Sequence, residues 1–147
     1  MPISTHTAPF PEQLSETICT LYRTIFDTPD DQKVRQRLRT QTGMTVQLFC
    51  DAQECPLGFK LGYPAEAGVF YSWLGGVLPE ARAQGIGAQL MAAQHDWCRA
   101  ARYHTVRTKT LNRWRSMLLL NIRAGFDIVA LEDKGDGIPR IILEKAL

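Results

Sequence analysis

Several features are missing from this sequence of 147 residues, and each absence excludes a class of protein. No apolar run approaches the length that spans a bilayer, so we expect no membrane segment. The N-terminus lacks a charged region followed by an apolar core, which argues against a secretory signal and favours a cytoplasmic protein. The formal net charge of +2 is too small to indicate a nucleic-acid partner.

The four cysteines lack the spacing of a metal or disulfide motif. None forms Cys-x-x-Cys, and without a secretory signal reduced thiols are the default. Cys50 and Cys55 could face each other across a hairpin, and His95 and Cys98 share a helix face, so a zinc site is one interpretation. Thiols packed as small hydrophobic side chains are the favoured interpretation, and no metal is expected.

Hydrophobic residues make up 45% of the chain, which suits one soluble globular domain over residues 1–147. Residues 1–11 contain prolines among polar residues and predict a loose arm. Apolar residues at helical spacing predict helices over residues 12–26, 31–41, 86–101 and 112–124. Alternating or continuously apolar segments predict strands over residues 44–50, 57–63, 69–78, 103–110, 127–131 and 138–143. These elements predict an α+β fold in α/β/α layers, with a mixed, mostly antiparallel central sheet of about six to seven strands flanked by about four helices.

Two of these elements carry more detailed expectations. The helix over residues 86–101 has an apolar stripe that is expected to face the core, formed by Ile86, Leu90, Ala93, Trp97 and Ala101. The strand over residues 69–78 is nearly continuously apolar, as in a central strand that is covered on both faces. Its interruption by Gly75 and Gly76 indicates either a bulge with a close ligand approach or packing against a helix.

The most informative stretch runs from Val77 to Ala88, where a strand turns into a helix through an arginine and two glycines. Such a turn leaves several backbone N–H groups unpaired, and the helix dipole adds about half a positive charge at that point. Together they form an anion site, and phosphate is its usual occupant. Gly85 and Gly87 let the backbone approach the anion, and Arg82 can add a charge-assisted contact.

Two common phosphate loops fit this stretch less well. The dinucleotide fingerprint requires a third glycine where a leucine stands, and the P-loop requires a Gly-Lys-Ser/Thr triplet that the sequence lacks. The stretch resembles instead the acetyl-CoA signature of the GNAT superfamily of N-acetyltransferases, which reads Arg/Gln-x-x-Gly-x-Gly/Ala after a Val-x-Pro that ends a central strand. Val77-x-Pro79 and Arg82-x-x-Gly85-x-Gly87 match it at the right separation. The alternative is an ordinary strand–helix turn that uses glycine for its shape.

The resemblance implies a single GNAT-like domain with acetyl-CoA as the acyl-donor co-substrate. Backbone N–H groups of the loop would hold the pyrophosphate, and the pantetheine arm would pair with a splayed central strand. The Val77 N–H is expected to polarise the thioester carbonyl, as an oxyanion hole does. The residues expected to bind acetyl-CoA are Val77, Arg82, Gln84, Gly85, Ile86, Gly87, Ala88 and Asn121.

A second motif of the same family is Gly125-Phe126, which follows a predicted helix. Many members carry, four residues before this glycine, a tyrosine that is proposed to protonate the CoA thiolate. Asn121 occupies that position here; it cannot supply a proton, but it can donate a hydrogen bond to a thiolate, hold the pantetheine arm or order the core. Asn121 is therefore a candidate catalytic residue. Glu66 is a candidate base for the amine, as are Glu80 and His104.

These observations predict an enzyme that moves an acetyl group from acetyl-CoA to a primary amine by direct attack in a ternary complex. An acyl-CoA-binding sensor or interaction module without catalysis is the alternative, because the usual tyrosine is absent. An interaction domain that uses the basic residues 99–115 is less favoured. The acceptor, a small-molecule or peptide amine, has no signature in the sequence, and a homodimer is implied only by the family resemblance.

Overall fold

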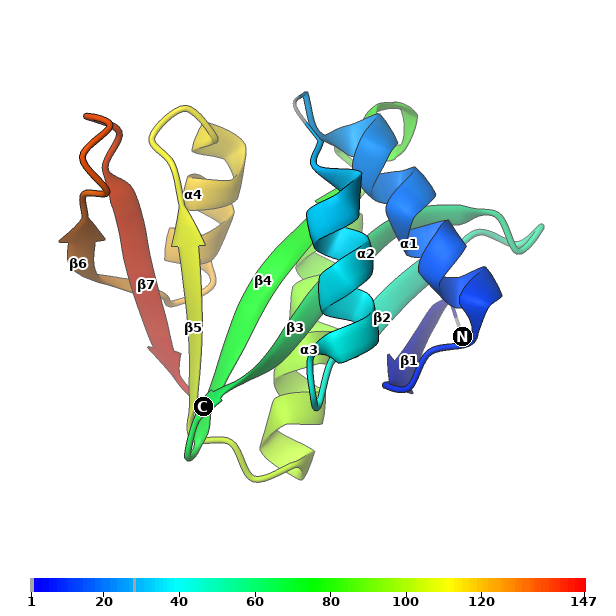
Figure 1. The fold of residues 1–147 in the computed structure, drawn as a ribbon, viewed down its shortest axis with the longest axis horizontal. Coiled ribbons are helices and arrows are strands. Elements are labelled where there is room, and N and C mark those ends of the chain that lie inside the picture. Colours follow the sequence, from blue (N-terminus) through cyan, green and yellow to red (C-terminus); the bar gives the residue numbers. More distant parts are fainter. Residues whose placement is uncertain (1, 28) are drawn as a thin grey trace.

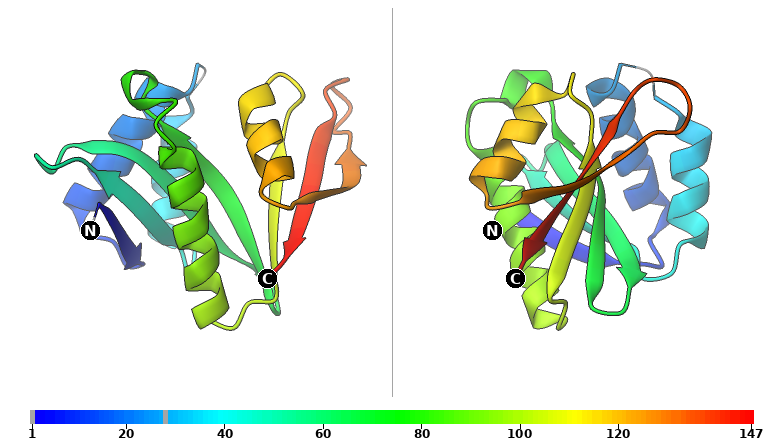
Figure 2. Two further views of the ribbon diagram at one scale, coloured as in Figure 1. Left: turned by 180° about the vertical axis from the view of Figure 1, so that it is seen from behind. Right: turned by 90° about the vertical axis from the view of Figure 1, so that its left-hand side faces the viewer.

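A seven-stranded mixed sheet forms the centre of the computed structural model, which describes residues 2–27 and 29–147 (Figures 1 and 2). The strand order is β1-β2-β3-β4-β5-β7-β6, and neighbouring strands run antiparallel except for the parallel pair of β4 and β5. The strands are β1 (Ile3–Thr7), β2 (Thr45–Cys50), β3 (Pro56–Glu66), β4 (Val69–Val77), β5 (Thr105–Thr110), β6 (Asp127–Glu132) and β7 (Arg140–Ala146). This sheet confirms the predicted fold class and its mostly antiparallel pairing.

Helices cover both faces of the sheet and complete the α/β/α layers (Figure 2). One face is covered by α1 (Glu12–Ile25) and α2 (Asp31–Thr40), and the other by α3 (Ile86–Ala100) and α4 (Arg115–Arg123). A short 3-10 turn, η1 (Pro79–Ala81), connects β4 to the loop before α3. Within the residues described, no helix is both long and apolar enough to cross a membrane.

The segment Ile3–Thr7 is a strand, so the prediction of a loose arm over residues 1–11 was wrong there; Met1 lies outside the described residues. This strand, β1, pairs with β2 from Ile3 opposite Phe49 to Thr7 opposite Thr45. Its side chains are mostly polar and exposed, so they carry no hydrophobic pattern. Backbone pairing at the sheet edge defines the strand, and a pattern of side chains cannot predict such pairing.

Several element boundaries also differ from the prediction, among them the start of β5 at Thr105 and the end of β7 at Ala146. β3 continues to Glu66, so the turn expected over residues 64–68 is reduced to two residues. α4 begins at Arg115 because the residues before it form a turn, in which Trp114 N–H donates to Leu111 O (3.1 Å). β7 begins at Arg140 because Ile138 N–H donates to the Asp136 side chain instead of to a strand.

The strands β4 and β5 separate part-way along their length (Figure 1). They pair only from Val69 opposite Thr105 to Ser72 opposite Thr108, although both strands continue further. The register of β4 against β3 shifts at Trp73, which is the extra residue of a bulge. The bulge expected at Gly75 and Gly76 is therefore at Trp73, because both glycines pair regularly with β3.

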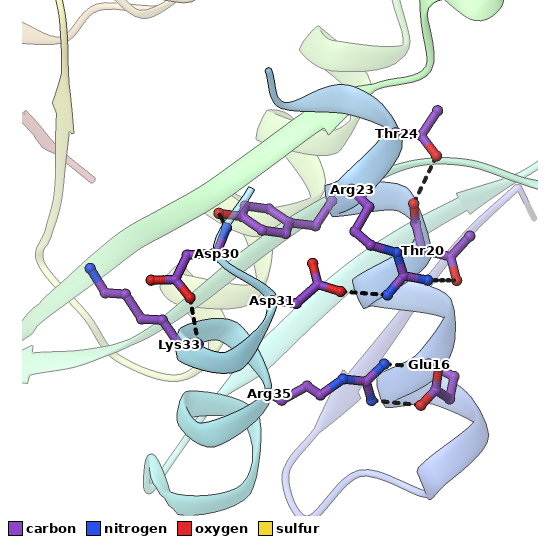
Figure 3. Close-up of polar contacts among 9 residues, drawn as sticks. Glu16, Thr20, Arg23, Thr24, Asp30, Asp31, Lys33 and Arg35 are labelled. Carbon is purple, nitrogen blue, oxygen red and sulfur yellow. Dashed lines mark hydrogen bonds and ion pairs between the residues drawn. The ribbon is translucent and has the colours of Figure 1, made fainter. Parts of the chain in front are cut away.

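The helices α1 and α2 are held to the sheet by a narrow apolar stripe. Val34 and Leu38 of α2 are buried, and their spacing of four residues places both on one face of the helix. Figure 3 shows polar contacts between the two helices, in which Arg35 donates to Glu16 and Arg23 pairs with Asp31 at 2.6 Å. Exposed pairs of this kind contribute less than about 1 kcal/mol each, so the apolar stripe supplies most of the stability.

The buried face of α3 differs from the predicted stripe. Ile86 and Leu90 are buried as expected, but the rest of the buried face consists of Met91, Gln94, His95 and Cys98. The helix is turned relative to the prediction because the sheet beneath it is also partly polar. Gln47 of β2 and Lys60 of β3 stand opposite each other in the register and are buried on the same face.

Acid is expected to destabilise the fold through His95, which is 3% exposed. Burial, with a smaller effect of the Lys145 and Lys60 charges, lowers the pKa of His95 to about 3. Below about pH 6.5 His95 takes up a proton in the unfolded chain, whereas in the folded chain it stays neutral down to about pH 3. The free energy of unfolding therefore decreases as the pH is lowered from about 6.5 to about 3. Urea unfolding at pH 7, 6 and 5 should show wild type losing more stability than His95→Leu, by about 0.7 kcal/mol from pH 7 to 6 and about 1.2 kcal/mol from pH 6 to 5.

The control for this experiment is His6→Gln, which alters an exposed histidine on β1. It should keep the pH dependence of wild type. Equal slopes for wild type and His95→Leu would show that His95 is not buried in its neutral form.

Candidate functional site

A cavity of about 770 Å³ lies where β4 and β5 separate. Its walls come from the free half of β4, the end of β5, the loop and first turn of α3, and the start of α4. On the α1 side it is bounded by Ile25, Phe26 and Asp27. Because α1 and α3 cover opposite faces of the sheet, the cavity passes through the opening between the two strands.

The start of α3 presents free backbone donors to this cavity. The first hydrogen bond of the helix runs from Gln89 N–H to Gly85 O (3.1 Å), and within the described chain the N–H groups of residues 83–88 have no protein acceptor. Ala83 and Gly85 have φ values of 62° and 78°, so the loop curves and its donors converge. A Cβ on Gly87 would make only an ordinary contact with Leu120, at 3.5 Å, so packing does not require glycine there. This donor-rich, electropositive loop fits an anion such as a phosphate.

Arg82 is anchored beside these donors. Its Nε donates to the Val77 carbonyl at 3.0 Å, and no carboxylate of the described chain pairs with it. Leu78 N–H donates to Leu57 O on β3, so the N–H and C=O of the preceding Val77 point away from β3. The Val77 N–H is therefore directed to the free edge of β4, on the cavity side.

The structure brings most of the predicted binding residues together. Val77, Arg82, Gly85, Ile86 and Gly87 all line the cavity. The side chains of Gln84 and Ala88 are exposed and do not form part of the cavity wall, although their N–H groups belong to the same row of donors.

The two residues predicted to be catalytic lie elsewhere. Asn121 is 2% exposed on α4, and within the described chain its Oδ1 has no hydrogen-bond partner and it is not part of the cavity wall. Glu66 lies at the end of β3, where it forms an ion pair with Arg107 at 2.7 Å. Arg107 also pairs with Glu144, so Glu66 belongs to a surface ion-pair group outside the cavity.

The α1 side of the cavity is aromatic and charged. The Phe26 ring meets the edge of Trp114 with centroids 6.2 Å apart, and the Arg113 guanidinium lies 5.5 Å from the Trp114 ring. Asp27 is the carboxylate-bearing residue among the described residues of the wall. A second molecule entering from this side would therefore meet aromatic surface and one carboxylate before it reached the opening in the sheet.

Lys60 of β3 also lines the cavity, and the sequence analysis missed it. The residue is 8% exposed, and burial lowers the pKa of its ammonium to about 8. A signal was present, because Lys60 is the single charged residue within the predicted strand over residues 57–63. The sequence does not show that this side chain reaches a cavity rather than solvent, because that depends on how β4 pairs with β3.

The sequence matches no protein-family model and no curated protein sequence. Its structure, however, is similar to several solved structures. A GNAT-family protein of Desulfovibrio desulfuricans superposes with a TM-score of 0.83 at 16% identity, covering 98% of both chains. The ribosomal-protein-S18-alanine N-acetyltransferase of Escherichia coli gives a TM-score of 0.79 at 11% identity, covering 97% of this chain and 94% of that one.

A third similar structure contains a ligand. A GNAT-family acetyltransferase of Elizabethkingia anophelis, with acetyl-CoA bound, gives a TM-score of 0.76 at 20% identity and covers 99% of both chains. All three similarities extend over nearly the whole of this chain. The chain therefore has the fold of the GNAT acetyltransferases.

Proposed function

We propose that this protein transfers an acetyl group from acetyl-CoA to a primary amine. The observation that carries the proposal is the continuity of one cavity, from the free donors of residues 83–88, along the unpaired edge of β4, to the opening in the sheet. These residues fit CoA: the unpartnered N–H groups suit its pyrophosphate, and the free strand edge suits the amides of its pantetheine arm. CoA supplies the activated thioester, and the chain holds it.

The chain's own groups would act mainly by binding and orientation. The loop donors and Arg82 hold the phosphates, and the Val77 N–H polarises the thioester carbonyl. The amine enters from the α1 side, where the Asp27 carboxylate attracts its ammonium form and accepts a proton through water. Attack occurs directly within the ternary complex, so no cysteine nucleophile is required. Asn121 and Glu66 take no step in this mechanism because neither lines the cavity.

A thermal-shift titration with acetyl-CoA tests the binding step, because a ligand that binds only the folded state raises Tm with concentration. Dephospho-CoA and ATP serve as controls for the contributions of the ribose phosphate and of the nucleotide alone. A saturable shift with acetyl-CoA supports the proposal. The same protein is then assayed for thiol release from acetyl-CoA with a panel of amino acids, polyamines and short peptides. No shift at millimolar acetyl-CoA would overturn the proposal.

The alternative function is an acyl-CoA-binding module without catalysis, and the absence of the usual tyrosine at position 121 favours it. Such a module would show the same thermal shift. It would release no thiol above the rate of buffer with any amine of the panel, so the two measurements together separate the functions.

Reversal of charge at position 82 is expected to weaken acetyl-CoA binding without unfolding the protein. Arg82 is exposed and its one side-chain hydrogen bond within the described residues is to the Val77 carbonyl, so Arg82→Glu removes little packing. The new carboxylate would repel the phosphates, and we expect an affinity loss of about 10-fold to 100-fold by calorimetry. Arg102→Glu, at an exposed site beyond α3, is the control. Equal affinities for both variants would contradict the assignment of the loop.

A further inference from the structure

Lys60 is a buried cation that the mechanism above leaves without a role. It is 8% exposed, and no ion pair within the described chain includes it. An unpaired ammonium is costly to remove from water, and burial lowers the pKa of Lys60 to about 8. An apolar side chain of similar length would avoid this cost, so the charge indicates a ligand rather than packing.

The side chain of Lys60 runs towards the free edge of β4. Lys60 stands opposite Gly75 in the register of β3 and β4, and a Cβ built on Gly75 would lie 3.1 Å from Lys60 Cδ. Glycine at position 75 therefore leaves the space in which the lysine stem crosses β4. Lys60, Ser72 and Thr108 line the same cavity, so the ammonium faces the point where β4 and β5 separate.

Among the described residues, no acidic side chain contributes to the pKa of Lys60, and Asp27 of the cavity wall lies on its α1 side. His95 of α3 faces this region, and the charges of Lys60 and of Lys145 on β7 both help to lower its pKa. Other polar groups buried in this region are the amides of Gln47 on β2 and Gln94 on α3 and the hydroxyls of Thr108 and Thr110 on β5, and Arg115 of α4 lies at the cavity wall. The surroundings of Lys60 therefore favour a ligand that carries a negative charge.

We propose that Lys60 donates the proton taken up by the CoA thiolate as it leaves. The inference rests on the acetyltransferase function proposed above. A CoA molecule with its pyrophosphate at α3 and its arm along β4 brings its sulfur to the opening between β4 and β5, beside the Lys60 ammonium. Asn121, which occupies the position of the family's tyrosine, has no proton to give and does not line this cavity.

The proton and electron changes of this step balance. The amine nitrogen forms a bond to the thioester carbon, and the tetrahedral oxyanion collapses to break the carbon–sulfur bond. Sulfur keeps the bonding electron pair and takes one proton from the Lys60 ammonium, which becomes a neutral amine. The extra proton on the acylated nitrogen is lost to water, and Lys60 regains a proton from solvent through the cavity. The net reaction converts amine and thioester into amide and thiol.

The test uses free CoA as the probe, so it does not depend on knowing the acceptor. The thiol of bound CoA is titrated by the ultraviolet absorbance of its thiolate, with protein alone subtracted, in wild type, Lys60→Met and Lys145→Met. Lys145 is a half-buried lysine on the same face that does not line the cavity, so its variant is the matched control. Removal of a buried unpaired charge should leave Lys60→Met folded, with an equal or higher Tm.

A cation beside the sulfur should make the thiol of bound CoA titrate at least one pH unit lower in wild type and in Lys145→Met than in Lys60→Met. Calorimetry should show CoA affinity within about threefold for all three proteins, since Lys60 does not touch the phosphates. Thiol titration that is the same in wild type and Lys60→Met, with normal CoA binding, would overturn this inference alone. Failure of wild type to bind CoA would overturn the acetyltransferase proposal and this inference with it.

Turnover gives a second readout that a structural role would not change. With an amine from the panel that supports thiol release, Lys60→Met should lower kcat by about 100-fold and leave KM for acetyl-CoA unchanged. The kcat of wild type should fall as pH rises through about 8, because the ammonium loses its proton, and this fall should vanish in Lys60→Met. Retention of the fall in the variant would overturn the inference.

Discussion

Gly87→Glu is expected to weaken acetyl-CoA binding several hundredfold while leaving the fold intact. Gly87 lies in the first turn of α3 and lines the cavity at the row of free donors. A Cβ there meets nothing closer than Leu120 at 3.5 Å, so the new side chain can be accommodated. An acidic residue in the first turn is favourable for a helix, so Tm should stay equal or rise. The same carboxylate lies beside the free N–H groups of residues 83–88 and repels the phosphates. The expected cost is about 3–4 kcal/mol of binding free energy, which is a loss of affinity of several hundredfold.

Calorimetry with acetyl-CoA measures this loss, and Gly87→Ala is the matched control. Alanine adds only the Cβ and should keep most of the affinity. Gly85 is less suitable for the experiment. Its φ of 78° means that any side chain there would strain the backbone as well as obstruct the phosphate site. Normal binding by a folded Gly87→Glu would show that the loop is an ordinary strand–helix turn.

Phe70→Ala is expected to lower the free energy of unfolding by about 3–5 kcal/mol, the upper range for truncation of a core side chain. Phe70 is fully buried on β4, within the segment that pairs with β5. Its ring packs against Trp97 and Tyr103, with centroids 5.5 and 5.3 Å away. A Cβ on Gly62 would lie only 2.4 Å from the ring, so the position of β3 that faces the ring has no side chain that could move into its place. The space left by the ring therefore cannot be refilled, and the cavity term should be large.

Urea unfolding measures the change, with Leu131→Ala as the control. Leu131 is 67% exposed on the edge strand β6, and its truncation should alter stability by less than about 0.5 kcal/mol. A loss below about 1 kcal/mol for Phe70→Ala would contradict the close packing of this ring against Trp97 and Tyr103.

Most helices and strands were predictable because their signals are local. The spacing of Ile18, Leu21 and Tyr22 predicts α1 and its buried face, and all three are buried. The anion loop was predictable for the same reason, since a row of free N–H groups before α3 belongs to consecutive residues. The strand β1 gave no local signal, because its side chains are exposed and only its pairing with β2 makes it a strand.

The sequence by itself determined the fold class, the order of the elements after β1 and the loop that fits a phosphate, because periodicity and closely spaced glycines act over a few residues. Only the tertiary structure decided that β4 bulges at Trp73 and leaves β5 after Ser72, since both depend on register between separate strands. It also turned α3 so that Gln94 and His95 are buried against a polar part of the sheet. The tertiary structure also placed the Lys60 side chain over Gly75 and in the cavity wall. This contact depends on the register between β3 and β4, which the hydrophobic pattern of either strand alone does not specify.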